Sequence, residues 1–381
     1  MQRTDGYPKK ARLGTEISVV VAFFLAAHLP GFSVTRYLGL AFRSPTTWGK
    51  WDTGLYLEIA DKGYSLNHCI NVPNRTPQDW CGTGGWFPGY PMVTRAVRDV
   101  FNWRTDMAAL VVSRAAFFVL LAVLWFGFLR DRPRRDAFYC LAFVCLFPGG
   151  VYYLALFPMS LATVGLLIAL LGVRKKQSAL LFLGAALAAF TYPIAVFGGL
   201  SITAALLIHP QTRRSQLGQA TCASAGSLVG FLATCTIFRT ATGHWNAFFL
   251  AQAGYHHPKA FPPIHILGRI LPIMNPSRTD EAVPAAQYLY VLVVLSLVTW
   301  TFLRKRQWPS PLEFSIATMV LVIYFASNYY GVGSSQFRHQ SLLLPLVLLS
   351  DRLTKARPAL LIVSAVITLQ MTALFVTGTI V

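Results

Sequence analysis

Charged side chains are scarce in this sequence of 381 residues: they make up 12% of it, whereas 55% is hydrophobic. A soluble domain would carry about 25% charged residues. Long apolar runs recur along nearly the whole length, and ten-residue stretches of strand-like alternation are missing. The sequence therefore predicts an all-α polytopic membrane protein, and it argues against an outer-membrane barrel.

Acidic side chains are scarcer still, with 14 Asp and Glu against 33 Lys and Arg. The basic residues gather in short, alternate loops of the chain, as the positive-inside rule requires. The net charge of +19 therefore reflects membrane topology, and it does not predict a nucleic-acid partner. No acid falls in the middle of a predicted span. An ion- or proton-coupled transporter usually needs such a carboxylate, so that class is disfavoured.

We expect one membrane domain over residues 1–381, with the N-terminus cytoplasmic and the C-terminus outside. The first apolar segment lacks a convincing cleavage site and is interpreted as a retained span. Two long outer loops are predicted, 31–106 with the candidate active site and 239–284, and a shorter one covers 329–338. The eleven predicted spans cover about 14–30, 107–129, 136–149, 158–173, 178–191, 193–208, 217–238, 285–303, 312–328, 339–351 and 358–377.

The first outer loop carries the most informative motif, Trp51-Asp52, at the start of an amphipathic segment in which Leu55 and Ile59 form an apolar stripe. Asp52 has two interpretations. Its carboxylate could cap the helix by accepting a backbone N–H, because Asp is a favoured N-cap residue. It could instead act as a base at the membrane surface, a role that capping hydrogen bonds would weaken.

Three segments of this loop resemble the PIG-V-like family, which includes GPI mannosyltransferase II and bacterial relatives within the GT-C superfamily: Trp51-Asp52, then 59–64 (Ile-Ala-Asp-Lys-Gly-Tyr), then 87–91 (Phe-Pro-Gly-Tyr-Pro). Weaker similarities follow at 242–252 and 335–339. Trp86, the stretch 157–160 and His339 depart from the family pattern. The resemblance implies a GT-C-like bundle with interfacial helices in the first outer loop.

The resemblance also implies an inverting glycosyltransferase, with Asp52 as the base beside the acceptor hydroxyl. The sugar, mannose by this resemblance, would come from a polyprenyl-phosphate donor on the outer face of the membrane. A lipid-linked donor fits the sequence, which has no Gly-rich phosphate loop and no nucleotide-sugar domain. The acceptor, a glycolipid, a glycan or a protein, is left open, as are the sugar and the oligomeric state.

Arg338 is the preferred partner for the donor phosphate, because a guanidinium binds phosphate oxygens bidentately. The alternative is an interfacial arginine that contacts ordinary lipid headgroups. Aromatic residues of the first loop could stack on a sugar or belong to an interfacial belt. The other expected substrate-binding residues are Trp51, Tyr64, Trp86, Tyr90, Gln252, His256, His257 and His339.

No cofactor and no metal site is predicted, since no cluster with ligand spacing surrounds the adjacent histidines at 256 and 257. Divalent-metal dependence is left open. Cys69 and Cys81 fall in the outer loop, where an oxidising compartment would permit a disulfide, and the sequence leaves their pairing open. Short loops and compact length favour a bacterial plasma membrane over the endoplasmic reticulum.

Two alternatives to an enzyme remain. A flippase for lipids or lipid-linked sugars would keep the fold, but the predicted spans provide few polar residues to line a path. A non-catalytic GT-C-like subunit would explain the departures at 157–160 and His339, although such a subunit has no need of Asp52.

The predicted topology gives a direct test. A cysteine introduced at position 74 should react with a membrane-impermeant thiol reagent added outside intact cells, because the first loop is expected there. A cysteine at position 175, in a basic loop, should react only after permeabilisation. Protection of position 74 in intact cells would contradict the proposed orientation.

Overall fold

The computed structural model describes residues 9–70, 72–73, 75–210, 214–255, 270–274, 279–304, 308–329 and 336–380. These ranges are helical apart from loops and an antiparallel hairpin of strands β1 (Leu66–His68) and β2 (Trp80–Gly82). The helices are α1 (Lys9–Tyr37), α2 (Pro45–Trp48), α3 (Thr53–Lys62), α4 (Gly89–Phe101), α5 (Thr105–Leu124), η1 (Trp125–Leu129), α6 (Arg134–Cys145), η2 (Pro148–Gly150), α7 (Val151–Leu154), α8 (Met159–Lys175), α9 (Ser178–Thr191), η3 (Pro193–Ala195), α10 (Val196–Ile208), α11 (Arg214–Thr242), α12 (Ala247–Ala253), η4 (Leu271–Met274), α14 (Thr279–Arg304), α15 (Pro311–Tyr329), α16 (Gln336–Ser341), η5 (Leu344–Leu353) and α17 (Arg357–Val376).

Six of the described helices are long and apolar enough to cross a membrane: α1, α5 with η1, α11, α14, α15 and α17. The pair formed by α6 and the segment of η2 and α7 is bent by 57° and would make a seventh. The prediction of an all-α, multi-pass membrane protein is confirmed. The predicted number of eleven spans is not, because α8, α9 and α10 coincide with predicted spans but fall short of this test.

The predicted span at 339–351 is not confirmed as a single helix. This region forms the short helix α16 followed by the 3-10 helix η5, not one regular helix. Pro345 lacks the backbone N–H that would donate to the carbonyl of Ser341 in a continuous α-helix. The hydroxyl of Tyr153 donates to that carbonyl instead.

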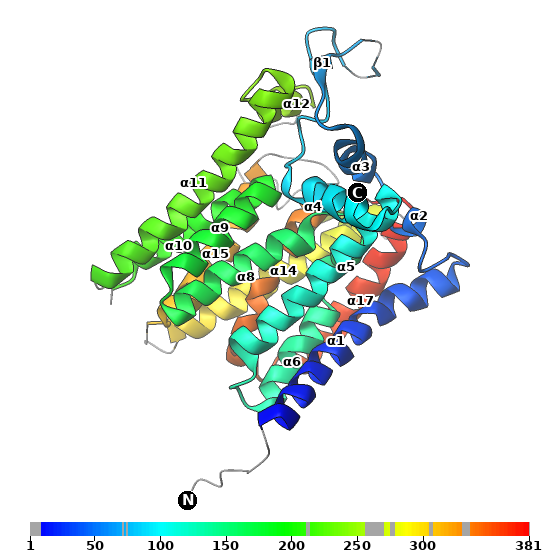
Figure 1. Ribbon diagram of the computed structural model, residues 1–381. Helices are drawn as coiled ribbons and strands as arrows, with labels where there is room; N and C mark the ends of the chain where they lie inside the picture. The colour runs from blue at the N-terminus through cyan, green and yellow to red at the C-terminus, as the bar shows by residue number, and fades with distance from the viewer. Residues whose placement is uncertain are drawn as a thin grey trace, which may run out of the picture.

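The helices run roughly side by side, and the short elements gather at one end of the bundle (Figure 1). The elements α2, α3, α4, α12 and the β1–β2 hairpin all lie at this end, which we call the α3 end. Helix α17 ends at the α3 end, whereas α1 begins at the opposite end of the bundle.

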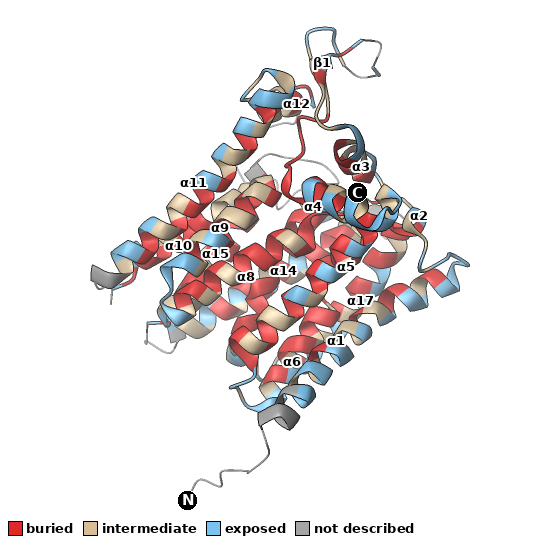
Figure 2. Ribbon diagram, in the orientation of Figure 1, coloured by how far each residue is buried: buried red, intermediate tan, exposed pale blue. Residues whose placement is uncertain are grey.

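Small residues allow the helices α8, α9 and α11 to pack closely. A Cβ added at Gly184 of α9 would lie 2.3 Å from the backbone nitrogen of Ala169 in α8. A Cβ at Gly226 of α11 would lie 2.3 Å from the carbonyl oxygen of Phe182 in α9. Close backbone approach through small residues is typical of membrane helices. Figure 2 shows that these helices turn buried residues toward one another and expose the outer side of α11.

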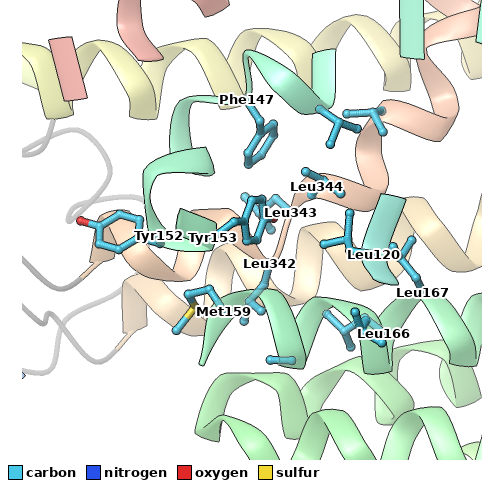
Figure 3. Close-up of a cluster of buried hydrophobic side chains, with 14 of the residues drawn as sticks. Leu120, Phe147, Tyr152, Tyr153, Met159, Leu166, Leu167, Leu342, Leu343 and Leu344 are labelled. Atoms are coloured by element: carbon cyan, nitrogen blue, oxygen red, sulfur yellow. The ribbon is translucent and has the colours of Figure 1, made fainter. Parts of the chain in front are cut away.

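The centre of the bundle is an apolar cluster that holds the segment after α16 in place (Figure 3). Leu342, Leu343 and Leu344 are at most 1% exposed and pack among side chains of α5, α7 and α8. The ring of Tyr152 points away from this cluster. The core therefore fixes the position of α16.

The close packing of α11 predicts an asymmetric response to enlarging its glycines. Gly226→Leu should destabilise the protein by about 1–3 kcal/mol, the usual range for overpacking, because a backbone carbonyl cannot move aside. Gly218→Leu on the same helix meets nothing within 4 Å and should be neutral. Thermal unfolding in detergent measures both, and equal effects of the two would contradict the close approach.

Candidate active site

Asp52 lies at the start of α3, but its carboxylate does not cap the helix. The Asp52 carbonyl accepts the backbone N–H groups of Leu55 and Tyr56, at 3.0 and 3.3 Å, while its side chain makes no capping hydrogen bond. The interpretation of this carboxylate as an N-cap is therefore wrong. The preceding Trp51 has a φ of 53° and is 55% exposed. This left-handed backbone is costly for a bulky residue and sharply redirects the chain just before Asp52.

The carboxylate of Asp52 instead forms an ion pair with Arg338, which lies 286 residues later in the sequence. The Arg338 Nη1 donates to Asp52 Oδ2 at 2.6 Å. The two partners differ in exposure, because the Arg338 side chain is 6% exposed and that of Asp52 is 27% exposed. The pair thus presents its carboxylate to the outside and keeps its cation inside.

The guanidinium of Arg338 has further contacts and a spare donor. It lies over the ring of Phe157, 5.2 Å from the centroid, which favours a cation. Its Nε is buried and has no hydrogen-bond partner among the described residues. A buried N–H without a partner costs free energy unless a ligand accepts from it. Arg338 therefore keeps one donor that no described residue uses.

The surroundings keep Arg338 charged and His339 neutral. Burial lowers the pKa of Arg338, but the charge of Asp52, the nearby Tyr192 and Tyr56, and the hydrogen bond to Asp52 together raise it, so the net shift is upward. Burial, and then the charge of Arg338, lowers the pKa of His339 to about 3. The imidazole of His339 is therefore uncharged at neutral pH.

The segment between α7 and α8 lies beside the ion pair and contacts the residues around it. Its Leu156 N–H donates to the carbonyl of Trp48 at 3.2 Å, and the Leu156 carbonyl accepts from the Thr53 hydroxyl at 3.5 Å. The next carbonyl, of Phe157, accepts from Ser113 of α5 at 3.3 Å. These bonds hold the Phe157 ring beneath Arg338 and join it to the residues around Asp52.

Helix α16 is fixed at both ends, which positions Arg338. The Ser341 hydroxyl donates to the Arg338 carbonyl at 2.5 Å, and the Ser341 carbonyl accepts from Tyr153. Near the start of the helix, the Gln287 amide donates to the Phe337 carbonyl at 3.5 Å. A side chain supported in this way is pre-organised for binding.

Helix α4 holds the other end of α3. Arg95 donates to the carbonyls of Ile59 and Ala60, each at 2.7 Å, and Arg98 pairs with Asp61 at 2.7 Å. Basic side chains at the C-terminus of a helix satisfy its last carbonyls and complement its dipole. These two arginines are thus occupied in holding α3.

Two predicted sugar-stacking residues use their hydroxyls inside the protein. The Tyr64 hydroxyl donates to the Trp86 carbonyl at 2.9 Å. The Tyr90 hydroxyl donates to the Ala109 carbonyl at 2.9 Å and lies 3.0 Å from the Ser113 hydroxyl. Burial raises the pKa of both tyrosines, so both stay neutral. They anchor the first loop to the bundle, and Tyr90 is only 1% exposed.

The remaining predicted residues lie in different places. Gln252 of α12 donates to the Gly85 carbonyl at 3.2 Å, which brings the second outer loop against the first. Trp86 is buried, with its ring 6.4 Å from that of Tyr255. The buried His339 ring lies 5.5 Å from Tyr192, and its Nδ1 has no hydrogen-bond partner among the described residues. Positions 256 and 257, the two predicted histidines, lie outside the described residues.

Several residues at the site were not predicted. Tyr56 is one helical turn after Asp52, so its position near the site could have been inferred from helical spacing. Its hydroxyl has a raised pKa, first through burial and then through Tyr192. Phe157 and Tyr192 carry no signal in the sequence, because only the packing of distant helices brings them to Arg338.

Cys69 and Cys81 form a disulfide, which answers the question that the sequence left open. The bond links Cys81 of β2, which stands opposite Asn67, to the residue that directly follows β1. Among the described residues, no group of three or more His, Cys, Asp or Glu is placed to hold a metal ion.

No protein-family model matches this chain, and no curated protein matches it. The resemblance to the PIG-V-like family therefore stays a prediction that rests on the motifs around Asp52. What the structure defines is a multi-pass helical membrane protein with a carboxylate–guanidinium pair at one end of its bundle.

The ion pair predicts strong coupling between Asp52 and Arg338 in a double-mutant cycle. Asp52→Asn should lower the unfolding temperature without unfolding the protein, because it leaves the buried guanidinium without its counter-charge. Arg338→Gln in that background should cost less than in the wild type. We expect a coupling energy of about 1 kcal/mol or more, measured by unfolding in detergent. Additive effects would contradict the pair.

Proposed function

We propose that this protein is an inverting glycosyltransferase that moves a hexose, most simply mannose, from a polyprenyl-phosphate donor to an acceptor at the outer face of the membrane. The observation that carries the proposal is the ion pair between Asp52 and Arg338. It combines a partly exposed carboxylate with a buried cation that has a donor to spare, at one end of a membrane bundle.

The proposed reaction is a single displacement at the anomeric carbon. The acceptor oxygen forms a bond to that carbon while the bond to the phosphate oxygen breaks, and the acceptor proton moves to Asp52. The polyprenyl phosphate leaves with the bonding electrons. Because a phosphate is already a good leaving group, the site needs a base and a cation rather than a general acid.

Arg338 would then couple donor binding to the position of Asp52. A phosphate oxygen that accepts from the spare Nε, or replaces Asp52 at Nη1, would draw the guanidinium away from the carboxylate. The Asp52 carboxylate would then be free to accept the proton of the acceptor hydroxyl.

The location of the pair suits a lipid-borne substrate. The α3 end of the bundle holds the short helices and hairpin, so a donor whose chain stays in the bilayer could bring its phosphate there. The disulfide between Cys69 and Cys81 in the same loop supports an oxidising, exoplasmic compartment.

The central test is transfer by wild-type protein and by Asp52→Asn, using a panel of polyprenyl-phosphate sugars and membrane glycolipids as acceptors. Loss of the base should reduce turnover by about 10²- to 10⁴-fold, with the protein still folded. Glu58→Gln, on the same helix, is the matched control and should keep its activity. Near-normal turnover by Asp52→Asn would contradict the assignment. Translocation of lipid-linked sugar without transfer would favour a flippase.

A further inference from the structure

We propose that Arg75, carried by the disulfide-bonded hairpin, is a second cation for the phosphate of the lipid substrate. The inference rests on the proposed function and deepens it, because it concerns the same site. It assigns a ligand contact to the loop between β1 and β2, which contains none of the motifs on which the proposed function rests.

The hairpin places the Arg75 guanidinium on the ring of Tyr255, with 3.8 Å between its Cζ and the ring centroid. The Arg75 Nη1 is buried and has no hydrogen-bond partner among the described residues. The disulfide between Cys69 and Cys81 closes the loop that carries Arg75. A cation with an unused buried donor is thus held in a defined place.

Tyr255 connects Arg75 to the ion pair. Its ring lies 6.4 Å from that of Trp86 in the first loop. Burial raises the pKa of Tyr255 and the charge of Asp52 raises it further, while the charge of Arg75, a side-chain hydrogen bond with Arg75 and the charge of Arg338 lower it. The hydroxyl of Tyr255 therefore lies within the electrostatic reach of all three charges.

The charge balance of the site calls for a second cation. Asp52 and Arg338 neutralise each other, so the pair alone does not attract a phosphodiester. During transfer, the departing phosphate gains a second negative charge, and Asp52 becomes neutral because it takes up the proton. The single positive charge of Arg338 then faces the two negative charges of the phosphate. Arg75 would supply a second positive charge for the phosphate. A fixed cation next to the negative charge that develops in the transition state lowers the barrier of the reaction.

Three other arginines of the α3 end are engaged elsewhere. Arg95 and Arg98 donate to the last carbonyls and the acid of α3. Arg104 is 83% exposed and pairs with Asp106. The acid nearest to Arg75 in the hairpin is Asp79, whose carboxylate accepts the backbone N–H of Thr76 at 2.8 Å and adds a negative charge beside Arg75.

Gly254 offers a way to displace Arg75 without changing any charge. A Cβ at Gly254 would lie 2.3 Å from the Arg75 Nη1, so Gly254→Ala must push the guanidinium aside. The backbone of Gly254 is right-handed helical, with a φ of −64°, and tolerates alanine.

The test measures binding of a long-chain polyprenyl phosphate to the full chain in lipid nanodiscs, with the uncharged polyprenol as the comparison ligand. Arg75→Gln should weaken binding of the phosphate by about tenfold or more, as for the loss of a charged hydrogen bond, and leave the polyprenol unchanged. Gly254→Ala should weaken it in the same direction. Arg104→Gln and Gly218→Ala are the matched controls and should bind as the wild type does.

The outcomes separate this inference from the proposed function. Weaker phosphate binding by Arg75→Gln and Gly254→Ala supports the inference even if no sugar transfer is found with any donor. Wild-type affinity in Arg75→Gln overturns it, whether or not the protein transfers sugar, and so does the lack of phosphate binding by the wild type. If thermal unfolding shows that Arg75→Gln does not fold, the phosphate affinity of Gly254→Ala is the deciding measurement. An affinity equal to that of the wild type in Gly254→Ala then overturns the inference.

Discussion

The ion pair between Asp52 and Arg338 joins the first loop of the chain to its last third, and the surrounding structure is arranged around it. A largely buried guanidinium is costly to desolvate, so it needs a counter-charge and close support. Asp52 supplies the charge, the ring of Phe157 supplies a favourable surface, and the bonds around Ser341 fix the backbone that carries Arg338.

This constraint explains why one end of the bundle is irregular. A continuous helix through residues 336–353 would give Arg338 no comparable set of backbone supports. The break before Pro345 frees the carbonyl of Ser341 for Tyr153, and the leucines at 342–344 pack in the core. The ion pair thus stands on fully buried residues of the bundle.

The sequence predicted the class of fold and both members of the pair, but not their contact. Composition and apolar runs suffice for a helical membrane protein, and Trp51-Asp52 marks the first loop. The preference of Asp for N-cap positions also favoured Asp52 as a helix cap. This prediction was wrong, because the carboxylate binds the guanidinium of Arg338, 286 residues away, instead of a backbone N–H. The positions of Phe157 and Arg75 could not be inferred, since they depend on packing between distant segments. The segment 339–351 is not the regular helix that was expected, because hydropathy does not register the break at Pro345.

The most direct measurement of the central claim is an electron cryo-microscopy map of the protein in lipid nanodiscs with a bound polyprenyl phosphate. The account predicts the phosphate within hydrogen-bond distance of the Arg338 guanidinium, with the Asp52 carboxylate facing the space beside it. A phosphate bound elsewhere on the bundle, with residues 52 and 338 far apart, would contradict it.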